Sequence, residues 1–176
     1  MGQSYPVHGY PVYYWPDYYW PGYYGTTGVS IVSIRQRILS AINTALSAST
    51  AIQYVTDKKE QWWDWGQNKY PGVCIVVGDE EDMRFCYTDG ANLDDMQSKM
   101  RVNVIGYVFD IRNELGTKRS DLISTIETAV ANSTGVTDLV EDIVLNKVQT
   151  DKGELENFSV INCEFGLDYL YNKENP

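Results

Sequence analysis

Apolar residues recur at helical spacing in two stretches of the chain. The first stripe begins beside Ser33 and Gln36, whose spacing is that of a capping box, and predicts an amphipathic helix over residues 32–47. The second stripe follows Ser120, a residue type that caps helices, and predicts a helix over residues 121–131. Each helix would have one apolar side to pack against a sheet.

Runs of β-branched and aromatic residues separate and follow these helices. In the last run Ile161, Cys163 and Phe165 share one face and Asn162 and Glu164 the other, which is typical of a strand with one buried face. The predicted strands cover residues 51–56, 72–77, 83–87, 100–111, 139–149 and 158–171. The pattern predicts an α+β fold: a mainly antiparallel sheet with two helices packed on one face and its longest strands in the middle.

Residues 5–24 repeat a five-residue unit four times, with an aromatic residue before each proline. Proline fixes its own φ and keeps the preceding residue out of the α region, so this segment is expected to form an extended arm. We predict an arm and joint over residues 1–28 and a single domain over residues 29–176. The arm side chains expected to form a protein interface are Tyr10, Tyr13, Tyr14, Trp15, Tyr18, Tyr19, Trp20, Tyr23 and Tyr24.

Three tryptophans lie close together in the charged segment over residues 57–69: Trp62, Trp63 and Trp65. Tryptophan is enriched at interface hot spots, so they could form an exposed anchor for another protein. Alternatively, two of them cover the sheet edge and one fills the core. The sequence leaves both interpretations open.

The formal net charge of -10 disfavours binding to nucleic acid or to an anionic membrane surface. The chain has no run of eighteen apolar residues and no signal-peptide pattern at its start, so neither membrane spanning nor standard secretion is expected. The three cysteines, Cys74, Cys86 and Cys163, form no closely spaced pair, which indicates reduced and mostly buried thiols in a cytoplasmic product.

No arrangement of residues favours catalysis. His8, the only histidine, lies in the arm, so the domain cannot assemble a serine or cysteine triad. The acidic run at residues 79–82 could offer oxygen ligands to a cation, but it lacks the spacing of a calcium loop, and a solvated acidic turn is favoured. We expect a non-enzymatic protein with no catalytic residue, no cofactor and no metal.

The region from residue 31 to residue 171 resembles the tail terminator, or tail completion, proteins of long-tailed bacteriophages. The matching features, in chain order, are the helix at 34–46, the segment Tyr70-Pro71-Gly72-Val73-Cys74-Ile75-Val76-Val77-Gly78-Asp79-Glu80, the strand at 101–110, the helix at 121–131, Val148-Gln149-Thr150-Asp151-Lys152-Gly153, and the aromatic-rich ending Leu167-Asp168-Tyr169. The arm departs from the usual compact start of that family.

The resemblance implies a virion structural protein that is assembled in the host cytoplasm. Such a protein forms a homo-oligomeric ring, commonly a hexamer, on the last ring of tail tube protein, ends tube growth and joins the tail to the head-tail connector in the neck. DNA would pass through the lumen without specific binding. The alternative is an adaptor that recognises a peptide or polymer through the arm and the segment from Trp62 to Trp65.

Overall fold

The computed structural model describes residues 32–58, 60, 62–85, 95–111, 114–151 and 156–172. The elements are the helices α1 (Ile34–Ser47), α2 (Leu115–Ala131) and α3 (Thr134–Thr137), the strands β1 (Tyr54–Thr56), β2 (Gly72–Phe85), β3 (Asp95–Phe109), β4 (Asp142–Thr150) and β5 (Phe158–Asn172), and the short 3-10 turns η1 (Trp62–Asp64) and η2 (Gln67–Lys69). The predicted arm lies outside the described residues. Within those ranges, no helix is both long enough and apolar enough to cross a membrane.

The five strands form one sheet in the order β1-β2-β3-β5-β4. β1 pairs with β2 in parallel, and the other three neighbouring pairs are antiparallel. The two longest strands, β3 and β5, occupy the interior positions, as their hydrophobic patterns predict. The predicted α+β fold with a mainly antiparallel sheet is confirmed.

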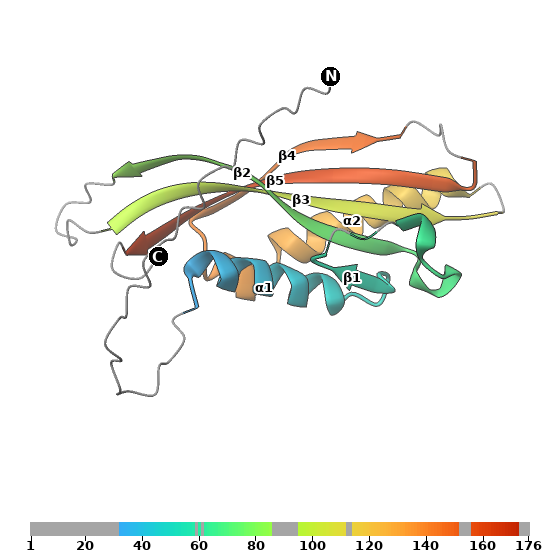
Figure 1. The fold of residues 1–176 in the computed structure, drawn as a ribbon, viewed down its shortest axis with the longest axis horizontal. Helices are drawn as coiled ribbons and strands as arrows, with labels where there is room; N and C mark the ends of the chain where they lie inside the picture. Colours follow the sequence, from blue (N-terminus) through green and yellow to red (C-terminus); the bar gives the residue numbers. More distant parts are fainter. Residues whose placement is uncertain are drawn as a thin grey trace, which may run out of the picture. The chain divides into compact units, whose positions relative to one another are not determined.

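Both long helices cover the same face of the sheet (Figure 1). Alternate residues of the central strands point toward them, and every third or fourth residue of each helix points back. The resulting core contains Ile38, Ile42 and Leu46 of α1, Leu122, Ile126 and Val130 of α2, Val102, Val104 and Val108 of β3, and Ile161, Cys163, Phe165 and Leu167 of β5. We call this side of the sheet the helix face and the opposite side the open face.

α1 begins where the capping box predicts. The Ser33 hydroxyl accepts a hydrogen bond from the Gln36 amide at 3.3 Å, and the Gln36 side chain accepts one from the Ser33 amide at the same distance. These two bonds satisfy amide groups that have no partner within the helix.

The predicted start of the second helix at residue 121, with Ser120 as its cap, is wrong, because α2 begins six residues earlier, at Leu115. Its first turn is held by Asp110, which is only 5% exposed at the end of β3. One Asp110 carboxylate oxygen accepts from the Glu114 amide at 2.7 Å, and the other contacts the Lys118 ammonium at 2.8 Å. The cap therefore comes from the preceding strand and not from within the helical pattern.

The predicted turn at residues 79–82 and the separate strand at 83–87 are also wrong, because β2 continues without a break to Phe85. β3 starts earlier than its hydrophobic pattern predicts and supplies partners for this extension, such as Lys99 opposite Glu81. The register shifts twice, between Val77 and Glu80 and between Glu81 and Arg84. These irregularities accommodate the acidic residues within a bent strand.

Smaller differences lie at the sheet edges. β1 is limited to residues 54–56, and β4 begins at Asp142 because the chain first turns through α3.

We predict that Asp110→Ala destabilises the domain by about 1–3 kcal/mol, because it removes the cap of α2 and leaves the Lys118 ammonium without this partner. Urea unfolding followed by circular dichroism would measure this loss. Asp121→Asn, on the exposed side of the same helix, is the matched control and should change stability by less than about 0.5 kcal/mol. Equal stability of the two variants would contradict the role of Asp110.

Candidate protein interface

Trp65 covers the open face of the sheet at the end where β1 lies. It is 7% exposed and packs with the buried residues Cys74 of β2 and Tyr107 of β3. The Trp65 ring meets Tyr107 edge to face at a centroid distance of 5.1 Å, and it meets Tyr54 of β1 in the same way at 5.0 Å. The segment from residue 57 to residue 71, which we call the Trp loop, is therefore folded onto the sheet by an aromatic cluster.

Glu60 ties the Trp loop to β1. Its carboxylate accepts a hydrogen bond from the Trp65 indole nitrogen at 3.0 Å and one from the Tyr54 hydroxyl at 2.9 Å. The Lys69 ammonium lies 3.9 Å from the same carboxylate and 4.0 Å from the centre of the Tyr54 ring. One carboxylate thus joins both ends of the loop, which orders it beyond what ring packing alone provides.

The aromatic cluster continues beyond Trp65 toward the end of the central strands. Tyr70 packs against Phe109 of β3 at 5.9 Å and against Phe158 of β5 at 5.7 Å, and these two phenylalanines lie 4.8 Å apart. This end of the open face is therefore apolar, and it requires the cover that the Trp loop supplies.

Gly72, where the loop enters β2, allows this close cover. A Cβ atom at that position would lie 2.5 Å from the Lys69 carbonyl oxygen and 2.6 Å from a ring carbon of Trp65. Neither neighbour can withdraw easily, because one is backbone and the other is wedged among aromatic rings. The absence of a side chain at Gly72 is what lets the indole reach the sheet.

The structure separates the three tryptophans predicted as an interface. Trp63 is 60% exposed, whereas Trp65 is an internal residue of the subunit. The side chain of Trp62 and the predicted arm residues, from Tyr10 to Tyr24, lie outside what the structure describes. Trp63 is thus the member of this set that is exposed among the described residues.

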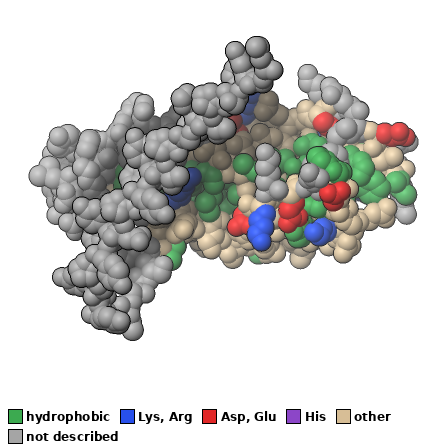
Figure 2. Space-filling view, viewed as in Figure 1, with side chains coloured by type: hydrophobic (Ala, Val, Ile, Leu, Met, Phe, Trp, Pro, Cys, Tyr) green, Lys and Arg blue, Asp and Glu red, His purple; other side chains and the backbone are tan. Residues whose placement is uncertain are grey.

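Two features of this region have no signal in the sequence. Glu60 looks like one more charge in a charged segment, and its role depends on partners that only the fold brings together. Ile111, which follows β3, is 71% exposed, although the sequence pattern assigns it to the strand. Apolar side chains gather at the end of the domain where η1 and η2 lie, as Figures 1 and 2 show together.

Away from the Trp loop, the open face is polar. The Lys99 ammonium on β3 lies 3.5 Å from the carboxylate of Asp168, the residue opposite it on β5. The other half-buried polar side chains of this part of the face include Arg101, Asn103, Asn162 and Glu164. On this part of the face the acidic side chains of β5 lie beside basic side chains of β3.

Burial favours the neutral forms of the described cysteines and of Tyr107. Burial, with smaller effects from Cys74 and Tyr70, raises the pKa of Tyr107 to about 12, and burial together with Glu127 raises that of Cys163 to about 11. Cys74 and Cys163 are free and buried thiols, and Cys86 lies outside the described residues. The part of the chain that the structure describes holds no group of three potential metal ligands. A raised thiol pKa is the opposite of what a reactive cysteine needs.

The fold and this site define an α+β domain with helices on one face of its sheet and a tryptophan-bearing loop on the other. The chain is similar to a chain in the solved structure "Virion of native gene transfer agent (GTA) particle", with 16% sequence identity and a TM-score of 0.35. The match covers 84% of this chain and 99% of that one. No protein-family model matches the sequence, and no curated protein does. At this identity and TM-score the match defines no family and assigns no role to any residue.

We predict that Gly72→Ala destabilises the domain by about 1–3 kcal/mol, because the added methyl group overlaps backbone and the Trp65 ring. Denaturation followed by tryptophan fluorescence would measure the loss and report any exposure of Trp65. Gly116→Ala is the control, since a Cβ there meets nothing within 4 Å. Because residue 116 lies within α2, the Gly116→Ala substitution should leave the stability of the domain unchanged or raise it by up to about 1 kcal/mol. If Gly72→Ala left the stability of the domain unchanged, the close approach of Trp65 to the backbone at Gly72 would be refuted.

Stability should fall as the pH rises from 10 toward about 12. Unfolded chains release the tyrosine proton near the ordinary pKa of 10.0, whereas Tyr107 keeps its proton in the folded state to about 12. The unfolded state then binds fewer protons than the folded state, so rising pH favours unfolding. Cys163 acts in the same direction from pH 9.0 to about 11. Tyr107→Phe should reduce the slope of unfolding free energy against pH in the upper window, and an unchanged slope would argue against a buried neutral phenol.

Proposed function

We propose that this protein is a non-enzymatic structural subunit of a bacteriophage-like virion, of the tail terminator kind. In this role its domains form a ring, commonly of six subunits, that ends the tail tube and presents a surface to the head-tail connector. The partners are then other copies of itself, the tail tube protein and the connector, and DNA passes through the lumen without specific binding.

The observation that supports this proposal is the order of elements on a single sheet. The domain runs from α1 to a strand that opens after Pro71, then through the long β3 to α2 and the aromatic-rich end of β5. This order agrees with the fold that the tail terminator resemblance implies. The acidic residues after Val77 depart from that pattern, because they lie within β2 and not in a turn.

The chemistry of the interior also favours a structural role. The described cysteines are buried with raised pKa values, and the carboxylates Glu60 and Asp110 each hold the fold together through defined partners. These groups stabilise surfaces and offer no activated nucleophile. An acidic subunit with net charge -10 also suits a channel that must not retain DNA.

A second candidate is an adaptor that binds a peptide or polymer through the arm and the Trp loop. The exposure of Trp63 on a loop held by Glu60 favours it, because ordered aromatic side chains make good interface anchors. The same observation is compatible with contact to a connector protein, so the two candidates differ in the partner and not in the surface.

We predict that deletion of residues 1–25 leaves the domain folded and able to form rings, while it impairs joining to the connector. The arm of every subunit would contribute to that contact, so its loss removes many weak interactions at once. Light scattering after gel filtration and electron micrographs of mixtures with purified tail tubes would measure ring formation and capping.

A full-length protein that stays monomeric at high concentration and never caps tubes would refute the terminator proposal. Loss of ligand binding after the deletion, in a protein that forms no ring, would favour the adaptor. Trp63→Ala in the full-length chain removes the exposed side chain of the Trp loop and keeps the arm, so its effect on partner binding measures the contribution of the loop. Ile111→Ala tests a second exposed position in the same way.

A further inference from the structure

Among the described residues, the outer edge of β2 has a partner strand only over its first three residues. β1 pairs only with the first three residues of β2, from Gly72 to Cys74. From Ile75 to Phe85, no strand among the described residues lies on that side. Such an edge presents backbone donors and acceptors that can pair with another strand.

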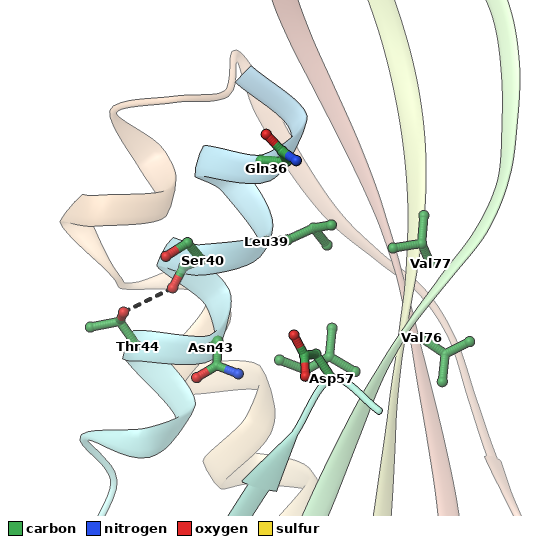
Figure 3. Close-up of a pocket in the computed structure, with 9 residues that line it drawn as sticks. Gln36, Leu39, Ser40, Asn43, Thr44, Asp57, Val76 and Val77 are labelled. Atoms are coloured by element: carbon green, nitrogen blue, oxygen red, sulfur yellow. Dashed lines mark hydrogen bonds between the residues drawn. The ribbon is translucent and has the colours of Figure 1, made fainter. Parts of the chain in front are cut away.

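A groove of about 500 Å³ lies beside this edge, between β2 and α1. Leu39 of α1 points toward β2, and Asp57 lies just past the end of β1, so the groove continues the line that β1 begins (Figure 3). Ile75 and Val77 belong to the helix face of β2, opposite Val104 and Val102 of β3. The groove therefore offers apolar contacts to side chains on one face of an added strand, in addition to the backbone edge.

The opposite edge of the same sheet is β4, which pairs only with β5 among the described strands. It is nine residues long and contains no proline, so every amide can take part in pairing. Two of its valines are unusually exposed, Val144 at 44% and Val148 at 39%. Val148 pairs with Cys163 and thus lies on the helix face, while Val144 pairs with Gly166 on the open face.

We propose that β4 of a second copy of this chain adds to the free edge of β2 and places Val148 in the groove beside Leu39 and Val77. Three successive antiparallel pairings, from β2 to β3, β5 and β4, make β4 antiparallel to β2. If a second copy continues the sheet in the same sense, its β4 therefore lies next to β2 of the first copy and runs antiparallel to it. The inference rests on the proposed ring and identifies the surfaces that form it.

Charge favours β4 over other strands as the occupant. Beyond Gly78 the edge of β2 carries four consecutive acidic residues, at 79–82, so two β2 edges would repel each other. With Val148 beside Val77, Lys147 of the second copy lies beside Gly78 and next to this acidic run. Because the two edges are different surfaces, the contact is head to tail, and repeated rotation can close it into a ring.

Site-specific disulfide formation tests the pairing directly. Two variants of the full-length chain, Val77→Cys and Val148→Cys, are made in a Cys86→Ser, Cys163→Ala background, because Cys163 lies opposite residue 148 in the same subunit and would compete for the new thiol. They are mixed and oxidised, and their covalent products are separated by mass. We expect the mixture to give cross-linked dimers that neither variant gives alone, and the double variant to give a ladder of products. Glu127→Cys, at an exposed position of α2, replaces either partner as the control and should give none.

The outcomes separate this inference from the proposed function. Species of ring size without the mixed cross-link would overturn the edge pairing while leaving the ring in place. Cross-linking of Val77→Cys alone or of Val148→Cys alone would instead indicate like edges in contact, and would also overturn it. A strict monomer by light scattering, with no cross-link, would sink both the pairing and the ring.

A pair of charge variants gives independent evidence. Val148→Asp should raise the concentration needed for assembly by at least about tenfold, because it replaces an apolar contact with Leu39 and Val77 by a carboxylate in a groove that already contains Asp57. Val144→Asp, on the same strand and similarly exposed but on the opposite face, should have a clearly smaller effect. Equal effects of the two variants would contradict docking in the groove, and circular dichroism of each monomer would verify that both remain folded.

Discussion

The pairing of β3 with β5 is the interaction on which the rest of the domain depends. Fifteen residues of each strand lie opposite one another, from Asp95 with Asn172 to Phe109 with Phe158. Because both strands keep one register throughout, their alternate residues form two continuous surfaces. The helix face is mainly apolar and receives α2, which approaches so closely at Gly106 that a Cβ there would come within 2.9 Å of Leu122. The open face is divided into an aromatic end and a polar remainder, and only the aromatic end needs a cover.

The elements that the sequence predicts well are those whose signals are local. The capping box at Ser33 and the alternation of β5 depend on residues a few positions apart, and both predictions are confirmed. The wrong predictions involve distant partners. The acidic run at 79–82 looks like a turn until the early start of β3 offers it a partner, and Ser120 looks like a cap until Asp110 supplies one from the preceding strand. The candidate site is harder still. Nothing in the sequence distinguishes Trp65 from Trp62 and Trp63, because its burial depends on contacts with Tyr54 and Tyr107 that only the fold brings about.

A single change of chain direction produces both the groove beside α1 and the Trp loop. After three residues of β1, the Thr56 hydroxyl accepts a hydrogen bond from the Lys58 amide at 3.1 Å, and the chain leaves the sheet. The Lys58 carbonyl then accepts from the Cys74 thiol at 3.3 Å, which fixes the departing segment against β2. From there the chain crosses to the open face, where Glu60 and Trp65 hold the Trp loop. If β1 continued along β2, it would fill the groove and would leave no segment to cover Tyr107.

This arrangement is compatible with the two kinds of contact that we propose for the domain. Aromatic packing and Glu60 hold the Trp loop in one conformation. Trp63 therefore lies on an ordered loop and loses little conformational freedom on binding. The strand edges offer backbone pairing, whose specificity comes from the valines and charges that flank them. Because β2 and β4 lie at opposite sides of one sheet, contacts through the edges leave the Trp loop free for a different partner. Self-assembly and recognition of a second protein are thus compatible within one subunit.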